Sequence, residues 1–334
     1  MFRRNKTSKW RNNTTINFIS IIMTFEELKE RQSWSLDQKI DHALGAIEQF
    51  YNKLNGQVFI SFSGGKDSTV LLHLARRIYP NIKAVFCNTR NEYPEIVNFV
   101  RKMKENGENI NIIQPHLTPK KVIEQYGFPM ISKDKAKAIY YAKHHPESKS
   151  AQQGLQLEND RVRIPLRYRY LIQENYDVSN KCCDKLKKEP LHEYVLETKT
   201  YPILGTLASE SKIREYAYVK KGGCNTFNNR DKRKQKSTPL AIWTEQDIQE
   251  YIKRYNVEIC NIYNKGLTRT GCAFCLFGAQ FKTDNRLQFL YNNYPKLYNM
   301  CMNYTNNGVT YREAARKFLK QTNITLPDEQ HSLF

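Results

Sequence analysis

The sequence lacks an apolar stretch long enough for a membrane-spanning helix. The longest candidate, residues 16–23, is short and is interrupted by Asn17 and Ser20, whereas a span needs roughly 20 apolar residues. No internal repeat is evident, and no small-residue cleavage pattern follows an apolar core, so we expect neither a repeat array nor a secretory signal peptide. These absences favour a soluble, cytoplasmic protein with no membrane partner.

Acidic residues are absent from the start of the chain, where Glu26 is the first one. The basic composition before it is compatible with a transit peptide. Residues 24–27, Thr-Phe-Glu-Glu, have instead the pattern of a capping box that opens a helix directly after Met23. We therefore expect residues 1–23 to be a disordered or non-native extension, with translation starting at Met23.

Acidic residues are also the minority overall, with 33 Asp and Glu against 53 Lys and Arg, which gives a formal net charge of +20. A large positive net charge favours binding to phosphate-rich partners, although the same charge can simply keep a protein soluble. Lysines and arginines alternate with tyrosines in residues 133–143 and 161–169, and a further basic run covers residues 220–236. Single-stranded nucleic acids bind proteins by stacking their bases on aromatic side chains and by placing their phosphates beside cations. A DNA or tRNA substrate is therefore an expected partner. A solvated charged loop is an equally good interpretation of the last run.

Residues 57–72 combine an apolar strand, a glycine-paired polar turn and the start of an amphipathic helix. Glycines in the turn let backbone N–H groups approach an oxyanion closely, the lysine adds a point charge, and the hydroxyls lie where the helix dipole favours negative charge. The turn is not of the Walker type, which has four residues between its first glycine and Gly-Lys-Ser/Thr. A chance Gly-Gly turn before a helix is the alternative. The predicted phosphate or sulfate site consists of Ser63, Gly64, Gly65, Lys66, Asp67 and Ser68.

Short apolar segments alternate with helix-length segments around this turn. Strand composition is found at residues 57–62, 84–88 and 110–114, with helix-length segments between them, which is the pattern of βαβ units and a parallel sheet. A further strand is expected at residues 201–206, and a helix capped at Thr244 follows it. The predicted fold class is therefore α/β. The expected organisation is N-terminal helices at 24–56, a nucleotide-binding domain at 57–265, and a helical C-terminal region with a cysteine half-site at 266–334.

Cysteine is scarce, with eight residues in the chain, and four of them occur in pairs. Cys182 and Cys183 are adjacent and cannot easily close one ring, whereas Cys272 and Cys275 form a CxxC turn that brings two sulfurs to a common centre. Two such half-sites favour one shared metal centre, and disulfides are the weaker choice in a cytosolic protein. Zinc, an iron-sulfur cluster and unliganded thiols all stay open, although tandem cysteines are awkward for the usual zinc spacing.

The turn Ser-Gly-Gly-Lys-Asp-Ser resembles the PP-loop, the signature of the ATP pyrophosphatases and of the phosphoadenosine phosphosulfate reductase family. Other blocks similar to this family are residues 86–89, 92–95, 205–211 with Arg214, and 269–272, so the resemblance spans residues 57 to about 280. It implies a Rossmann-like parallel sheet of the adenine nucleotide alpha-hydrolase type. The cysteine pairs resemble those of the iron-sulfur reductases, which implies a 4Fe-4S cluster held by Cys182, Cys183, Cys272 and Cys275.

The resemblance also implies roles for single residues. Asn88 and Gly205 would contact the nucleoside of ATP or of a sulfonucleotide, while Ser211 and Arg214 would face its anionic part. An ordinary turn residue at 88 and an ordinary surface cation at 214 are the plainer interpretations. A Mg ion is expected at Asp67. The residues expected to be catalytic are Lys66, Asp67 and Arg214.

Two departures from the reductases bear on the reaction. The family's Asp-Thr-Gly is replaced by Asn88-Thr89-Arg90, and the nucleophilic cysteine of a C-terminal Glu-Cys-Gly segment has no counterpart after Cys301. We therefore expect a PP-loop ATP-using enzyme that adenylates a substrate or transfers sulfur, similar to the DNA-phosphorothioation enzymes. A sulfonucleotide reductase, in which Cys301 or Cys224 substitutes for the nucleophile, and a non-catalytic nucleic-acid-binding protein are the alternatives. The expected protein partner is a sulfur donor or a thiol reductant.

Overall fold

The computed structural model describes residues 23–155, 164–228, 231 and 234–329. Two capped helices open the described chain: α1 (Phe25–Gln32) and α2 (Leu36–Lys53). Thr24 and Glu27 form the capping box of α1, and Ser35 begins α2 with a second box. The capping box predicted at Thr24 is thereby confirmed, because the side chain of each partner bonds to the backbone N–H of the other.

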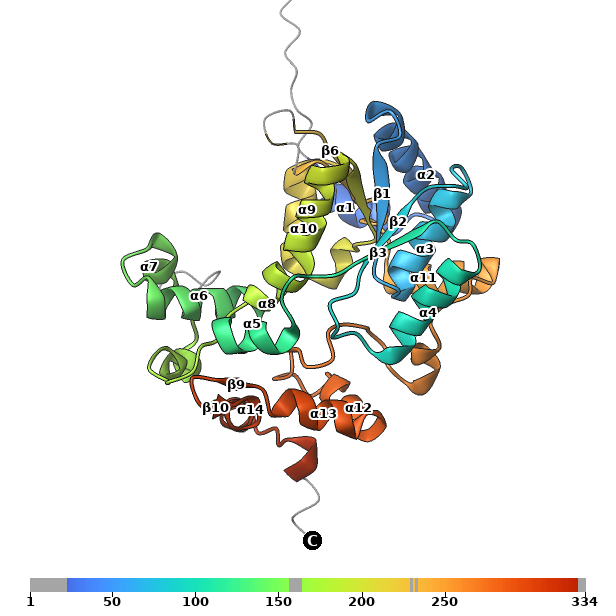
Figure 1. Ribbon diagram of the computed structural model, residues 1–334. Coiled ribbons are helices and arrows are strands. Elements are labelled where there is room, and N and C mark those ends of the chain that lie inside the picture. Colours follow the sequence, from blue (N-terminus) through green and yellow to red (C-terminus); the bar gives the residue numbers. More distant parts are fainter. Residues whose placement is uncertain (1–22, 156–163, 229–230, 232–233, 330–334) are drawn as a thin grey trace, which may run out of the picture.

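A six-stranded sheet with the order β3-β2-β1-β5-β7-β6 forms the centre of the molecule (Figure 1). Its strands are β1 (Val58–Phe62), β2 (Ala84–Cys87), β3 (Ile110–Ile113), β5 (Tyr201–Leu204), β6 (Asn225–Thr226) and β7 (Lys236–Ser237). All neighbouring strands pair in parallel except β6, which closes one edge antiparallel to β7. The carboxyl ends of β1, β2 and β5 therefore meet at one edge, where open α/β sheets place their ligands.

Helices flank the sheet, and α2, α3 and α11 pack against one another beside it (Figure 1). A π-helical turn (Asp184–Lys188) joins α8 to α9, and such turns are frequent at functional sites. The helices after α2 are α3 (Lys66–Arg76), α4 (Pro94–Glu105), α5 (Pro119–Tyr126), α6 (Lys133–His144), α7 (Lys149–Leu155), α8 (Lys181–Cys183), α9 (Glu189–Thr198), α10 (Lys212–Lys221), α11 (Glu245–Tyr255), α12 (Arg286–Asn293), α13 (Pro295–Met302) and α14 (Tyr311–Lys320). Short 3-10 segments are η1 (Leu166–Ile172), η3 (Ala208–Glu210) and η5 (Asn261–Lys265).

Two small strand pairs attach the C-terminal part to the middle of the chain. β4 (Met130–Ile131) pairs in parallel with β8 (Leu276–Phe277), and the hairpin of β9 (Thr305–Asn306) and β10 (Val309–Thr310) lies against α5. The buried side chain of Asn306 donates to the carbonyl oxygen of Ile123 at 3.1 Å and accepts from the N–H of Asp177 at 2.7 Å. These contacts hold the segment after Cys275 in place, and sequence patterns did not predict them.

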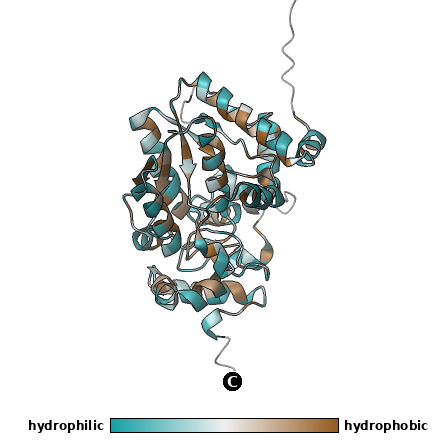
Figure 2. Ribbon diagram, turned by 90° about the vertical axis from the view of Figure 1, so that its right-hand side faces the viewer, coloured by the Kyte–Doolittle hydropathy of each residue, from teal (hydrophilic) through white to brown (hydrophobic). Residues whose placement is uncertain are grey.

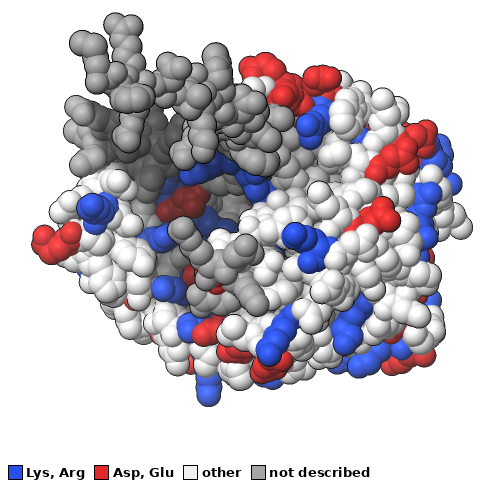
Figure 3. Space-filling view, turned by 90° about the horizontal axis from the view of Figure 1, so that it is seen from above, with Lys and Arg blue, Asp and Glu red and all other residues white. Residues whose placement is uncertain are grey.

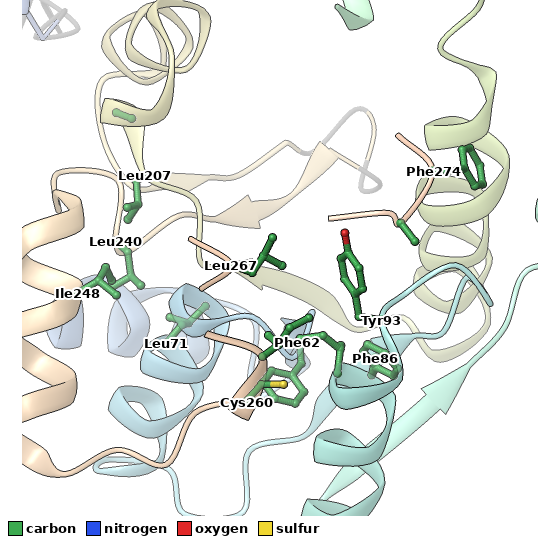
Figure 4. Close-up of a cluster of buried hydrophobic side chains, with 14 of the residues drawn as sticks. Phe62, Leu71, Phe86, Tyr93, Leu207, Leu240, Ile248, Cys260, Leu267 and Phe274 are labelled. Carbon is green, nitrogen blue, oxygen red and sulfur yellow. The ribbon is translucent and has the colours of Figure 1, made fainter. Parts of the chain in front are cut away.

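One apolar core runs from Met23 to Leu326. Figure 4 shows Phe62 of β1, Phe86 of β2 and Leu71 of α3 in one cluster with Leu267 and Phe274, and all five are buried. Apolar residues concentrate on the central strands, whereas the outer lengths of the helices are largely hydrophilic (Figure 2). The segment between α11 and α12 is therefore packed onto the carboxyl ends of the strands by the core itself.

The predicted α/β fold with a mostly parallel sheet is confirmed. Strands lie at all four of the predicted positions, and Thr244 caps α11 with a complete capping box to Asp247. Among the described residues, no helix has both the length and the apolar character needed to cross a bilayer.

Candidate active site

The loop between β1 and α3 brings the start of a helix close to the space where a ligand can bind. Gly64 has a φ of 70°, and a Cβ atom there would lie 2.9 Å from Cγ2 of Ile96. Gly65 is the N-cap of α3, and a Cβ atom on it would lie 2.7 Å from Oγ1 of Thr270. Both positions therefore require glycine, and together they expose the positive end of the helix dipole to an anion.

Hydroxyl groups fix the conformation of this loop. The N–H of Ser63 donates to Oγ of Ser68 at 3.1 Å, and the N–H of Gly65 donates to Oγ of Ser63 at 3.3 Å. The hydroxyls of Ser68 and Thr69 both donate to the carbonyl oxygen of Gly65, at 2.9 and 3.0 Å. The loop is thus held in its curved form before any ligand arrives.

Lys66 is held by residues far away in the sequence. Its backbone N–H donates to the hydroxyl oxygen of Tyr263 at 2.8 Å, and its ammonium group donates to the carbonyl oxygen of Thr268 at 3.2 Å. The ammonium also lies 3.2 Å from Oε2 of Glu245. The Tyr263 hydroxyl lies 3.3 Å from Oγ1 of Thr270. No sequence motif marked Tyr263, Thr268 or Glu245 as part of the site.

A cavity of about 260 Å³ lies beside the loop. Two arginines of its wall share one carboxylate: Arg214 forms an ion pair with Glu210, and Arg269 lies 3.4 Å from Oε1 of the same residue. A phosphate can replace Glu210 as the partner of both guanidinium groups. Among the predicted site residues, the cavity wall contains Ser63, Gly65, Lys66, Asp67, Ser68, Gly205 and Arg214.

Asp67 carries a buried carboxylate oxygen without a hydrogen bond in this wall. Its Oδ1 has no hydrogen-bond partner and lies 3.9 Å from Nζ of Lys66. Burial raises the pKa of Asp67, and the nearby Lys66 opposes that rise. Gly205 allows β5 to approach closely here, since a Cβ atom on it would lie 3.0 Å from the carbonyl oxygen of Asp67. A carboxylate oxygen that lacks a hydrogen bond beside a phosphate-sized cavity fits a Mg ion, which prefers oxygen ligands.

Two predicted ligand contacts lie away from the cavity wall. Asn88 is buried after β2, where its side-chain oxygen accepts from the N–H of Arg90 at 3.0 Å. Ser211 caps α10, and its hydroxyl accepts from the N–H of Arg214 at 3.3 Å. Both residues are in the described part of the chain, and neither lines the cavities at this sheet edge. Their contacts with nucleoside or anion stay predictions.

A second cavity, of about 170 Å³, lies next to the first one. The two share Ser61, Ser63 and Thr270 in their walls. The wall of the second cavity also contains Lys187 and Gly271, the residue before the first cysteine of the CxxC turn. We call these two neighbouring cavities the trough; they border the phosphate loop on one side and the residue before the CxxC turn on the other.

The two cysteine pairs lie near enough to act on one another electrostatically. A hydrogen bond between the thiols of Cys182 and Cys183 lowers the pKa of Cys183 to about 6 and raises that of Cys182. The N–H of Cys275 donates to the carbonyl oxygen of Cys272 at 3.1 Å, and the charge of Cys183 acts on both of these thiols. The charge of Cys272 raises the pKa of Lys187, which also hydrogen-bonds to that sulfur. Sequence reasoning missed Lys187, although its i, i+4 spacing from Cys183 was a usable signal.

The chemistry of this donor set fits a thiolate-bound cluster. The four thiols influence one another electrostatically, and the cations near them include Lys187, Lys133 and Arg286, which suit the negative charge of such a cluster. In the parts of the chain that the structure describes, however, no group of three or more His, Cys, Asp or Glu side chains is arranged to hold a metal ion. The 4Fe-4S cluster stays a prediction.

The two other cysteines considered as nucleophiles are buried. Cys301 is 0% exposed, and burial raises its pKa to about 12. Cys224 is 6% exposed, and burial raises its pKa as well. Neither thiol lines the two cavities. The structure thus gives no support to either residue as a substitute nucleophile.

The basic segments are described only in part. Residues 1–22 of the predicted extension, and residues 161–163, 229–230 and 232–233 of two basic segments, lie outside the described residues. On α6, the ammonium of Lys137 lies 5.6 Å from the ring centre of Tyr141. The ammonium of Lys181, the first residue of α8, lies 5.8 Å from the ring centre of Tyr140 on α6. Figure 3 shows Lys and Arg side chains interspersed with Asp and Glu on one face, and some of them line a hollow there. A nucleic-acid partner stays a prediction.

Comparisons with known proteins add a family model and named relatives. The model described as phosphoadenosine phosphosulfate reductase domain matches residues 57–156 and 168–276. The chain is 26% identical over 259 residues to the adenosine 5'-phosphosulfate reductase of Bacillus mycoides (strain KBAB4), covering 76% of this chain and 88% of the relative. It is 25% identical over 264 residues to the enzyme of the same name from Geobacillus thermodenitrificans (strain NG80-2), covering 78% and 90%.

Two solved structures are also similar over most of the chain. The phosphoadenylyl-sulfate reductase from Candida auris, in a phosphate complex, aligns with a TM-score of 0.42 and 11% identity over 75% of this chain and 96% of that one. The U34-tRNA thiolase from Methanococcus maripaludis, with its 4Fe-4S cluster, aligns with a TM-score of 0.32 and 13% identity over 84% and 80%.

Proposed function

We propose a function for this chain from one premise: it belongs to the phosphoadenosine phosphosulfate reductase family. We infer that this enzyme binds ATP at residues 63–68, cleaves it between the α and β phosphates, and uses the adenylated acceptor for sulfur transfer. The acceptor we propose is a nucleic acid, since the net charge is +20. Eight free cysteines favour a reducing compartment, the cytoplasm, as the site of action.

The observation that carries the proposal is the trough between the phosphate loop and the cysteines. The two cavities share three wall residues, so a nucleotide bound at the loop would lie beside the cavity whose wall includes Gly271, the neighbour of Cys272. Carboxylates in the wall support Mg-ATP over a bare phosphosulfate, because Asp67 and Glu210 repel an anion that brings no cation with it.

The residues of the trough would act mainly by binding charge. When an acceptor oxygen attacks the α phosphorus, the bond from that phosphorus to the α–β bridging oxygen breaks, and pyrophosphate leaves with the electron pair. The ammonium of Lys66 and the dipole of α3 would stabilise the charge that develops on the pyrophosphate, while Arg214 and Arg269 would hold its outer oxygens. A Mg ion at Asp67 would supply further charge neutralisation.

Sulfur chemistry would take place at the other end of the trough. Cys182, Cys183, Cys272 and Cys275 would hold the 4Fe-4S cluster, which supplies a binding point for sulfur when it is present. Lys187 would hold Cys272 in position and face the ligand cavity with the rest of its side chain. The donor of sulfur or electrons would be a separate protein or a small thiol.

A second candidate function is sulfonucleotide reduction, and the adenosine 5'-phosphosulfate reductases among the relatives favour it. In that reaction a thiol attacks the sulfur, AMP leaves, and a second thiol releases sulfite while a disulfide forms. Cys301 and Cys224 are buried away from both cavities. Cys87 lines the second cavity, but its thiol donates to the carbonyl oxygen of Leu186 at 3.3 Å and burial raises its pKa to about 12, so both thiols would come from a partner reductant.

An anaerobic two-substrate assay tests the proposal. Purified, metal-replete protein is given Mg-ATP with single-stranded DNA or tRNA and a sulfur donor, and in parallel adenosine 5'-phosphosulfate with a thiol. We expect pyrophosphate from the first mixture and no sulfite from the second. If sulfite forms and pyrophosphate does not, the second candidate function replaces the proposal. If neither product forms, only a nucleotide-binding role remains.

Arg214→Ala is the matched variant for this assay. Loss of a charge-assisted contact to phosphate should lower kcat/KM for ATP by about tenfold to a hundredfold. Arg101→Ala is the control, because Arg101 is exposed on α4 and lines neither cavity. Equal activity of the two variants would show that Arg214 does not contribute to ATP binding.

A further inference from the structure

A third cavity, of about 210 Å³, adjoins the phosphate cavity and has no role in the function proposed above. It shares Leu204, Thr206 and Arg214 with the phosphate cavity, and it shares no residue with the cavity that leads to the cysteines. The phosphate cavity therefore shares wall residues with both of the other cavities, which share none with each other. A ligand in the third cavity would lie next to the nucleotide bound in the phosphate cavity.

One face of α10 forms a wall of this third cavity. Residues Arg214, Ala217, Tyr218 and Lys221 line it, at positions i, i+3, i+4 and i+7 of the helix. A cation therefore lies at each end of the face, about 10 Å apart along the helix axis. The small side chain of Ala217 between them leaves room for a ligand.

The charges of the third cavity have one sign. Its walls contain Arg214, Lys221 and Lys236, and none of the described residues that line it is Asp or Glu. The ammonium of Lys221 donates to the carbonyl oxygen of Cys224 and to Oγ1 of Thr238, both at 2.8 Å. One N–H of that ammonium is left for a ligand. Burial lowers the pKa of Lys221 to about 8, so an anion beside it would relieve an unfavourable environment.

The rest of the wall is apolar. Leu204, Leu207, Ala208 and Ala241 line the space between the cations. A flat apolar group could pack there while its anionic substituent reaches Lys221. This combination differs from the phosphate cavity, where carboxylates and hydroxyls form much of the wall.

We propose that the third cavity binds a second nucleotide unit, with its phosphate at Lys221 and Lys236 and its base against Leu207 and Ala241. The inference deepens the proposed function and rests on it, because this unit would be the part of the nucleic-acid acceptor next to the ATP. A free mononucleotide has the same chemistry, and competition distinguishes the two sources.

Matched lysine substitutions on α10 test this site. Lys221→Met removes the charge inside the cavity, and Lys220→Met removes the same charge from the next residue, which is exposed and does not line it. Binding of a fluorescent single-stranded 12-mer is measured by anisotropy at about 0.15 M salt, with AMP as competitor. We expect Lys221→Met to weaken binding about tenfold more than Lys220→Met does.

Each outcome either identifies the ligand of the third cavity, a nucleic-acid strand or a free mononucleotide, or overturns the proposed site. With the phosphate loop saturated by ATP, weak competition by AMP identifies the strand as the ligand of the third cavity, and strong competition identifies a free mononucleotide. Equal affinities of the two variants would mean that only overall charge attracts the strand, and would overturn the proposal. If Lys221→Met fails to fold, the exposed Lys236→Met is compared with Lys220→Met instead. Pyrophosphate release from ATP is scored separately, so a failed enzyme assay leaves this result interpretable.

Discussion

Two lysines on neighbouring helices each meet a carboxylate from the first turn of α11, and the two pairs have different consequences. Nζ of Lys39 lies 2.7 Å from Oδ2 of Asp247, and Nζ of Lys66 lies 3.2 Å from Oε2 of Glu245. Both lysines are buried, but the carboxylate side chains are 12% and 56% exposed, respectively. One turn of α11 thus closes the first pair off from water and leaves the second open beside the phosphate loop.

The first pair is part of a buried hydrogen-bond network. Lys39 also donates to the carbonyl oxygen of Gln32 at 2.7 Å, and Oδ2 of Asp247 accepts from the N–H and the hydroxyl of Thr244. The second pair lies beside Asp67, whose Oδ1 is 3.9 Å from Nζ of Lys66 and has no hydrogen-bond partner. Buried hydrogen-bonded networks stabilise the fold, whereas charged groups in a cleft that lack hydrogen bonds mark a place for a ligand.

The largest predicted effect comes from breaking the closed pair. Lys39→Met leaves the carboxylate of Asp247 without its counterion in a buried site. We expect the free energy of unfolding to fall by about 3–5 kcal/mol, measured by urea denaturation. ATP affinity of the folded fraction should stay unchanged, because Lys39 lines none of the cavities along the trough.

Lys102→Met is the control for that prediction. Lys102 pairs with Glu258 at 3.4 Å, and both side chains are largely exposed. Its removal should change the free energy of unfolding by less than about 1 kcal/mol. A similar loss in both variants would show that burial does not distinguish these pairs.

The next largest effect comes from breaking the open pair. Lys66→Ala removes the ammonium that would stabilise the departing pyrophosphate, so kcat should fall about 10²- to 10³-fold, or about 2.7–4 kcal/mol in the barrier. The free energy of unfolding should change far less than in Lys39→Met, because the partner Glu245 remains hydrated. Pyrophosphate release and urea denaturation on the same sample measure both quantities. Full activity in Lys66→Ala would contradict the assignment of this lysine.

The contrast between the two pairs also shows what local sequence can predict. The strand, the glycine turn and the start of α3 occupy residues 58–66 without a break, so their chemistry was readable from the order of residues. Thr24 and Thr244 were recognisable as caps for the same reason, since each bonds within the next turn. Parallel pairing followed from the alternation of strands and helices.

Contacts between distant residues were beyond such patterns. The Tyr263 hydroxyl that accepts from the N–H of Lys66 is 197 residues away, and the pair of Lys39 and Asp247 spans 208 residues. The pair of Lys39 and Asp247 depends on how α11 packs on α2, and the contact of Tyr263 depends on where η5 lies in the fold, both of which are properties of the whole core. The hairpin of β9 and β10 is likewise stabilised by Asn306 bonding to α5, not by its own short strands. Only Lys187 had a local signal that was overlooked.

The smallest predicted effect comes from loosening the open pair without removing its lysine. Glu245→Gln keeps the shape of the side chain but removes the charge that competes with phosphate for Lys66. We expect ATP to bind about two- to fivefold more tightly at low salt, with the gain shrinking as salt is raised, since the carboxylate is largely exposed. Glu245 is also one of the groups that raise the pKa of Asp67, so that carboxylate should ionise at lower pH in the variant. Calorimetric titration with Mg-ATP at two salt concentrations measures the change, and a tenfold loss of affinity would instead make Glu245 a ligand of the bound metal.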